Sequence, residues 1–138
     1  MSPEQITITA DVAAPPSTVW EAYTAPEHIT RWNFASDDWC CPSASNDLRV
    51  GGPYSARMEA KDGSFGFDFT AIYEVIEPER SFTYRMEDGR IVTTTFEQLD
   101  DTTRVTTVFD AETENPVDMQ RDGWQAILNN FKAHAETL

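Results

Sequence analysis

The dipeptide Asp62-Gly63 stands between two stretches of alternating apolar and polar residues, and this arrangement limits the fold more than any other feature of the chain. Asp-Gly is a preferred centre for a two-residue type I′ turn, because both central positions of that turn need a positive φ. Such a turn joins residues 53–60 to residues 65–76 as an antiparallel hairpin. It also fixes the register, in which Ala60 pairs with Phe65.

This register gives the hairpin one apolar face and one polar face. Across the polar face, Arg57 stands opposite Asp68, and opposite charges in this position stabilise a strand pair by roughly a few tenths of a kcal/mol. We therefore expect both side chains at the surface; a reversed pleat would turn them inward as an acid/base pair. The apolar face consists of Tyr54, Ala56, Met58, Phe67, Phe69 and Ala71.

Further strands and two short helices are predicted on either side of this hairpin. Alternation indicates strands at residues 6–12, 82–86, 91–97 and 103–110. Prolines that suit a first helical turn open short helices at residues 16–23 and 26–32. Residues 33–47 favour a long loop with room for a short strand.

A second Asp-Gly pair, Asp88-Gly89, predicts another hairpin whose ideal register is awkward. It would place Tyr84 opposite Thr93, although the apolar face of the following strand contains Val92 and Phe96. We expect a bulge near this turn.

The C-terminal residues 115–138 predict one long amphipathic helix. Asn115 suits the N-cap and Pro116 the first helical position. Gly123 lies within the helix, where we expect it to leave room for close approach of backbone or ligand. The apolar stripe consists of Trp124, Ile127, Leu128, Phe131 and Ala135.

Composition places these elements in a single α+β domain over residues 1–138. The chain is 40% hydrophobic and 25% charged, as in globular proteins. A formal net charge of −14 without a basic cluster argues against nucleic acid and anionic membranes as partners. We find neither a membrane-spanning run nor a signal peptide, and expect a cytoplasmic monomer or homodimer.

No motif for catalysis, a metal or a cofactor is found, so the sequence predicts no catalytic residues, no metal and no cofactor. The adjacent Cys40 and Cys41 are expected to be free thiols, because a disulfide between neighbours closes a strained ring. His28 is expected at the surface, and His134 in the last helical turn, where a cation suits the helix dipole.

The order of these elements resembles the START-like helix-grip fold, and more narrowly the family of the activator of Hsp90 ATPase, which is grouped with polyketide cyclases and Bet v 1-like proteins. The resemblance spans nearly the whole chain. The residues that carry it are 14–20 at the first helix, Trp32, residues 47–52, the strand 69–76 before Pro78, residues 92–96, Gly123-Trp124, Ile127-Leu128 and Phe131.

This resemblance implies a curved antiparallel sheet of about six to seven strands around the C-terminal helix, with two short helices after the first strand and an apolar cavity between sheet and helix. Tyr54, Tyr84, Thr94 and Thr107 are the polar tips expected to orient a ligand there. The ligand-binding candidates are Trp32, Phe34, Tyr54, Met58, Phe67, Phe69, Tyr84, Phe96, Trp124, Leu128 and Phe131.

Three functions remain open on the sequence alone. The first is a module that binds an apolar or aromatic small molecule, lipid-like or polyketide-like, in the cavity. The second is a cyclase or dehydratase acting on a polyketide-like substrate, which needs an ionisable side chain in the cavity with a shifted pKa. The third is a co-chaperone of Hsp90, although the chain lacks the second domain of the eukaryotic activator.

Overall fold

The computed structural model describes residues 4–138 and has the α+β helix-grip fold expected from the sequence. A single seven-stranded antiparallel sheet has the strand order β1-β7-β6-β5-β4-β3-β2. The elements are β1 (Gln5–Val12), α1 (Pro16–Thr24), α2 (Pro26–Trp32), β2 (Trp39–Asn46), β3 (Pro53–Ala60), β4 (Gly66–Glu77), β5 (Ser81–Met86), β6 (Ile91–Gln98), β7 (Thr103–Asp110) and α3 (Val117–Ala135).

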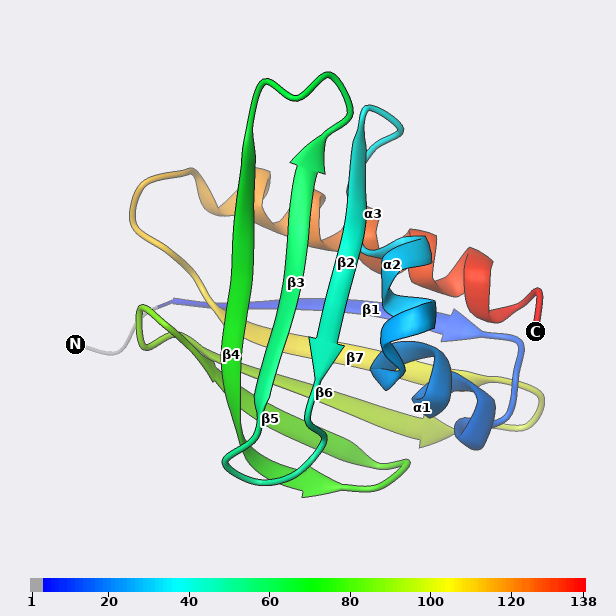
Figure 1. The fold of residues 1–138 in the computed structure, drawn as a ribbon. Helices are drawn as coiled ribbons and strands as arrows, with labels where there is room; N and C mark the ends of the chain where they lie inside the picture. The colour runs from blue at the N-terminus through cyan, green and yellow to red at the C-terminus, as the bar shows by residue number, and fades with distance from the viewer. Residues whose placement is uncertain (1–3) are drawn as a thin grey trace.

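The sheet curves strongly, so that β2, β3 and β4 cross the direction of β1, β6 and β7 (Figure 1). Helix α3 runs across the side that this curve encloses, while α1 and α2 lie at one end of the sheet. Alternate residues of β1 are buried along its whole length, as the sequence predicts. The buried face of the sheet and the inner side of α3 form the core.

The first hairpin has the predicted register but a different turn. Ala56 pairs with Phe69 and Met58 with Phe67, so the predicted inward face is confirmed. Gly63 has φ +77° and its amide donates to the Ala60 carbonyl at 2.9 Å, whereas Asp62 has no positive φ. The connection is therefore a four-residue loop, and the predicted type I′ turn is wrong. The register survives because both loops leave Ala60 opposite Phe65.

The second hairpin contains the extra residue expected near its turn. Tyr84 pairs with Val92, and the Met86 amide donates to the Arg90 carbonyl at 2.8 Å. The loop therefore has three residues, with Gly89 at φ +91°. A three-residue loop of this kind closes with a glycine in the left-handed region. It shifts the pairing by one residue and brings Tyr84 and Val92 to the same buried face.

Strand β2 is longer than the short strand that was expected within a long loop over residues 33–47. It pairs with β3 from Trp39 to Asn46, with a shift in register between Cys40 and Ser43. Pro42 lies within that shift, on a strand at the edge of the sheet, where a residue without an amide hydrogen is tolerated. Both cysteines are free thiols, as expected.

The start of α3 also differs from the prediction. Pro116 occupies the N-cap position, and Asn115 makes no N-cap hydrogen bond; its side chain donates instead to the Glu112 carboxylate. Gln120 holds this segment, because its amide nitrogen donates to the carbonyls of Asn115 and Glu112. The close approach of another backbone segment that was expected at Gly123 is not found, since a Cβ there would meet no atom within 4 Å beyond the adjacent residues and backbone of its own helix.

Two histidines that are far apart in the sequence join α2 to α3. Nδ1 of His28 lies 2.9 Å from Nε2 of His134, a distance at which one imidazole donates its N–H to the unprotonated nitrogen of the other. Partial burial and the nearby His28 and Arg31 lower the pKa of His134. The prediction that His28 is a simple surface residue is therefore wrong.

We expect the free energy of unfolding to decrease as the pH falls from 7.5 to 5.5. A histidine whose pKa is lowered by folding stabilises the folded state fully above its unfolded pKa of about 6.5, and this stabilisation is lost as the pH falls through the lower, folded pKa. Urea unfolding at the two pH values measures the change. His134→Gln should reduce the difference in unfolding free energy between the two pH values. An equal difference in the variant would show that the pH dependence does not come from His134.

Candidate functional site

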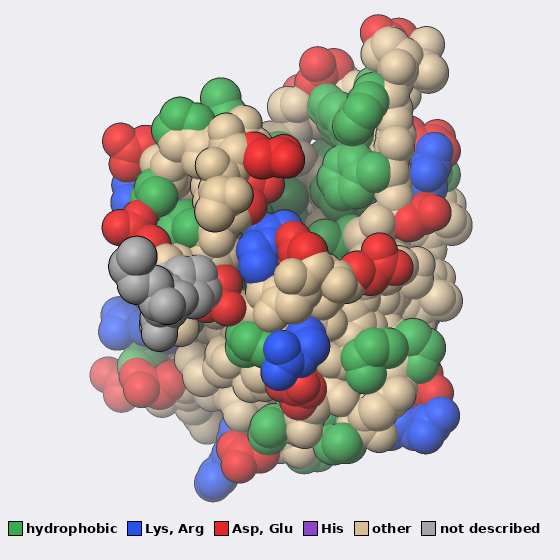
Figure 2. Space-filling model, turned by 90° about the vertical axis from the view of Figure 1, so that its left-hand side faces the viewer, with side chains coloured by type: hydrophobic (Ala, Val, Ile, Leu, Met, Phe, Trp, Pro, Cys, Tyr) green, Lys and Arg blue, Asp and Glu red, His purple; other side chains and the backbone are tan. Residues whose placement is uncertain are grey.

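A cavity of about 450 Å³ lies between the concave face of the sheet and α3. This volume falls within the range of about 300–1,000 Å³ that is usual for small-molecule sites. Figure 2 shows the face on which it opens, where hydrophobic side chains surround a hollow and a basic side chain lies beside acidic ones at its edge.

The walls of the cavity are mostly apolar and come from both ends of the chain. Strands β3, β4 and β5 contribute inward side chains at alternate positions, and α3 contributes four residues from successive turns. Trp32 and Asn33 close the side next to α2. The principal apolar and aromatic wall residues are Ile8, Tyr23, Trp32, Tyr54, Met58, Phe67, Phe69, Tyr84, Met86, Trp124, Ile127 and Leu128.

Eight of the eleven ligand-binding candidates line this cavity: Trp32, Tyr54, Met58, Phe67, Phe69, Tyr84, Trp124 and Leu128. The other three lie outside it. Phe131 is fully buried between Tyr23 and Trp32, with ring centroids 4.8 and 5.1 Å away. Phe96 packs against Trp20 at the end of the core near α1, and Phe34 packs against the core from outside.

Trp124 is held in the wall by a stacked aromatic pair. Its ring lies parallel to that of Phe109, with centroids 3.8 Å apart and an interplanar angle of 11°. It also makes a T-shaped contact with the ring of Phe69 on β4, with centroids 6.2 Å apart. The indole thus bridges α3 and both arms of the curved sheet and is fixed on one side of the cavity.

The four polar tips expected in the cavity fall into two kinds. Thr107 lines the cavity and Thr94 does not; their hydroxyls lie 2.9 Å apart, so these two satisfy each other. Tyr54 and Tyr84 line the cavity as stacked rings with centroids 5.5 Å apart. Burial raises the pKa of both phenols well above the ordinary value, so they remain protonated at physiological pH.

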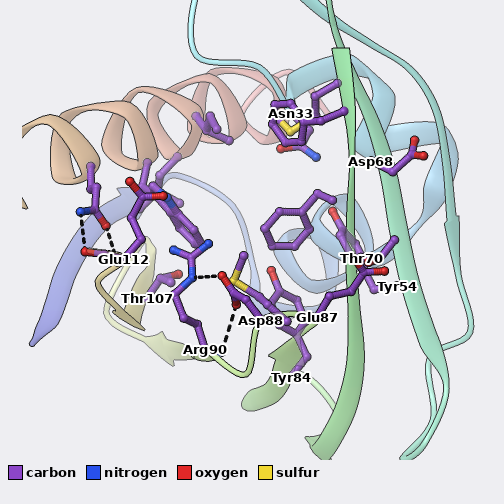
Figure 3. Close-up of a pocket in the computed structure, with 18 of the residues that line it drawn as sticks. Asn33, Tyr54, Asp68, Thr70, Tyr84, Glu87, Asp88, Arg90, Thr107 and Glu112 are labelled. Carbon is purple, nitrogen blue, oxygen red and sulfur yellow. Dashed lines mark hydrogen bonds and ion pairs between the residues drawn. The ribbon is translucent and has the colours of Figure 1, made fainter. Parts of the chain in front are cut away.

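The mouth of the cavity carries charged residues that sequence reasoning did not select. Glu87, Asp88 and Arg90 come from the β5–β6 loop and Glu112 from the segment before α3 (Figure 3). The side chain of Arg90 is 19% exposed, and its Nε donates to Asp88 at 2.8 Å. No signal in the sequence points to them, because residues in an Asp-Gly loop are usually solvated.

Asp88 is held as a carboxylate by its neighbour. Partial burial acts to raise its pKa, but hydrogen bonds from the amide and guanidinium of Arg90 outweigh burial and lower the pKa overall. Asp68 also borders the cavity, but its carboxylate points away from it (Figure 3) and lies 3.4 Å from Arg57 on the outer face of the sheet. The expected surface pair is therefore confirmed.

Among residues 4–138, no group of three or more His, Cys, Asp and Glu side chains is arranged to bind a metal ion. Over the same residues, no helix is long and apolar enough to cross a membrane.

The curved sheet, the enclosed C-terminal helix and the cavity between them define a helix-grip domain of the START-like class. The family profile described as activator of Hsp90 ATPase homolog 1-like protein matches residues 13–136. The chain belongs to this family.

Solved structures give the same result. An AHSA1-like protein from Aeromonas hydrophila is 41% identical, with 97% of this chain and 93% of that chain covered and a TM-score of 0.91. A protein from Cytophaga hutchinsonii is also 41% identical, over 96% and 92% of the chains, with a TM-score of 0.83. No curated protein matches the chain.

A more distant structure, described as the Aha1 dimer from Colwellia psychrerythraea, is 15% identical over 96% of both chains, with a TM-score of 0.74. At this identity it supports the shared fold alone.

Proposed function

We propose that this protein binds an apolar or aromatic small molecule in the cavity between its sheet and α3. The observation that carries the proposal is a cavity of about 450 Å³ whose wall is largely aromatic and includes two buried phenols. Apolar walls with a few polar groups that fix orientation are typical of small-molecule sites.

Binding is favoured over acid/base catalysis by the protonation of the cavity's side chains. Burial raises the pKa values of Tyr23, Tyr54 and Tyr84, while the pKa of Asp88 is lowered. Each of these shifts moves the pKa of the group further from neutral pH, whereas a general acid or base works best with a pKa near the operating pH. The two histidines lie outside the cavity wall. A cyclase or dehydratase is thus the weaker alternative.

A role with Hsp90 is suggested by the family description alone. Nothing in the geometry of the cavity requires such a partner, and the cavity supports ligand binding whether or not one exists.

The proposal is tested with N-phenylnaphthylamine, an uncharged aromatic probe whose fluorescence rises in apolar surroundings. We expect saturable binding at a single site, with energy transfer from tryptophan because Trp32 and Trp124 line the cavity. Native mass spectrometry should show one probe per chain. Absence of saturable binding, or binding only after the protein is unfolded, would contradict the proposal.

A further inference from the structure

Two of the three tyrosines that line the cavity, Tyr54 and Tyr84, stand on strands that run in the same direction. Tyr54 is on β3 and Tyr84 on β5, and both strands pair with β4 between them. Their rings are nearly parallel, with an interplanar angle of 26° and centroids 5.5 Å apart. Each residue is only 6% exposed, and each lines the cavity. Two phenols are therefore presented side by side to the same enclosed space.

Neither hydroxyl of this pair has a hydrogen-bond partner among residues 4–138. The hydroxyls of Thr94 and Thr107, by contrast, have partners, because they hydrogen-bond to each other at 2.9 Å. Over the same residues, Oδ1 of Asn46 is the one fully enclosed side-chain N or O atom without a partner, so the two phenol oxygens are open to the space of the cavity. An acceptor on a ligand there would add hydrogen bonds that contribute about 0.5–1.5 kcal/mol each. The phenols thus mark a position in the cavity where a bound molecule meets free polar groups.

The protonation of the phenols selects the kind of atom they bind. Because burial keeps both protonated, each has an O–H to donate. A carbonyl oxygen has two lone pairs and can accept from both phenols, whereas a hydrocarbon offers no acceptor.

The charges at the mouth select against anionic molecules. Glu87, Asp88 and Glu112 are the carboxylates there. Arg90 is the one cationic residue among those that line the cavity, and it is already paired with Asp88. The formal net charge of the whole chain is −14. An anion entering this cavity would lose hydration and meet an excess of carboxylates.

We propose that the cavity selects uncharged aromatic molecules that carry a carbonyl group, with the hydroxyls of Tyr54 and Tyr84 donating to the carbonyl oxygen. This inference rests on the proposed function and specifies its ligand class. It assigns to the two tyrosines a role in specificity.

Three compounds with the same ring and similar size test this inference by displacing N-phenylnaphthylamine: ethylnaphthalene, acetylnaphthalene and naphthoate, substituted at the same ring position. We expect the ketone to bind about tenfold more tightly than the hydrocarbon, because two hydrogen bonds each contribute about 0.5–1.5 kcal/mol. Naphthoate should bind most weakly.

The variant Tyr54→Phe/Tyr84→Phe should bind the ketone and the hydrocarbon equally, while its affinity for the hydrocarbon is retained. Tyr73→Phe is the matched control, because Tyr73 is a buried inward phenol of the same sheet that does not line the cavity. It should keep the preference for the ketone. Circular dichroism and a single unfolding transition show that each variant is folded.

The possible results separate this inference from the proposed function. If the hydrocarbon displaces the probe and the ketone has no advantage, the carbonyl inference is wrong and ligand binding stands. If naphthoate binds most tightly, Arg90 is the recognition group and the inference is overturned. If the probe does not bind at all, the proposed function itself fails.

Discussion

Phe131→Ala should lower the free energy of unfolding by about 3–5 kcal/mol, the largest effect expected of any single substitution discussed for this protein. The side chain is fully buried, and its ring meets those of Tyr23 from α1 and Trp32 from α2. Its removal leaves a cavity where α1, α2 and α3 meet, which these rigid rings cannot fill. The total stability of a domain is about 5–15 kcal/mol, so the loss is a large fraction of it.

Urea denaturation followed by tryptophan fluorescence and by circular dichroism measures this change. Phe65→Ala is the matched control, because the same side chain is removed where it is 61% exposed. We expect the control to change stability by less than about 1 kcal/mol. Similar losses in both variants would show that Phe131 is not a central residue of the core.

Met86→Trp should weaken binding of N-phenylnaphthylamine by about tenfold or more, which corresponds to about 1.4 kcal/mol or more of binding free energy. Met86 is the last residue of β5, faces inward opposite Ala71 and lines the cavity near its mouth. An indole at this position occupies space that the probe needs. The fold should survive, because the larger side chain enters open volume instead of a packed core.

The matched control is Val75→Trp on the neighbouring strand β4. Val75 is 47% exposed and does not line the cavity, so an indole there leaves the cavity unchanged. Its probe affinity should equal that of the wild type. Unchanged affinity in Met86→Trp would place the probe elsewhere on the protein and would contradict the proposed site.

Local chemistry accounts for the parts of the fold that the sequence predicted well. Side chains alternate strictly along a strand, so the inward faces of β1 and of the β3–β4 hairpin follow from the order of apolar and polar residues. The same reasoning predicted an extra residue near Asp88-Gly89, because an ideal register would have mixed the two faces. Helix α2 begins and ends at the predicted residues, Pro26 and Trp32.

The length of strand β2 was underestimated because its pairing is not local. Its residues do not alternate in hydrophobicity, and Pro42 argues against a strand in most contexts. The segment is a strand because its backbone pairs with β3, and it tolerates Pro42 because it lies at the edge of the sheet. The pair of His28 and His134 was missed for a similar reason, since 106 positions in the chain separate its members.

The sequence by itself determined the fold class, the family resemblance and the faces that turn inward, because periodicity and turn residues act over a few positions. Only the tertiary structure decided which inward residues pack and which line a cavity. Trp124 and Phe131 belong to the same helical stripe, yet the first lines the cavity and the second is sealed in the core. The neighbours of each residue set this difference, because Phe131 packs against Tyr23 of α1 and Trp32 of α2, whereas Trp124 packs against Phe109 and Phe69 of the sheet.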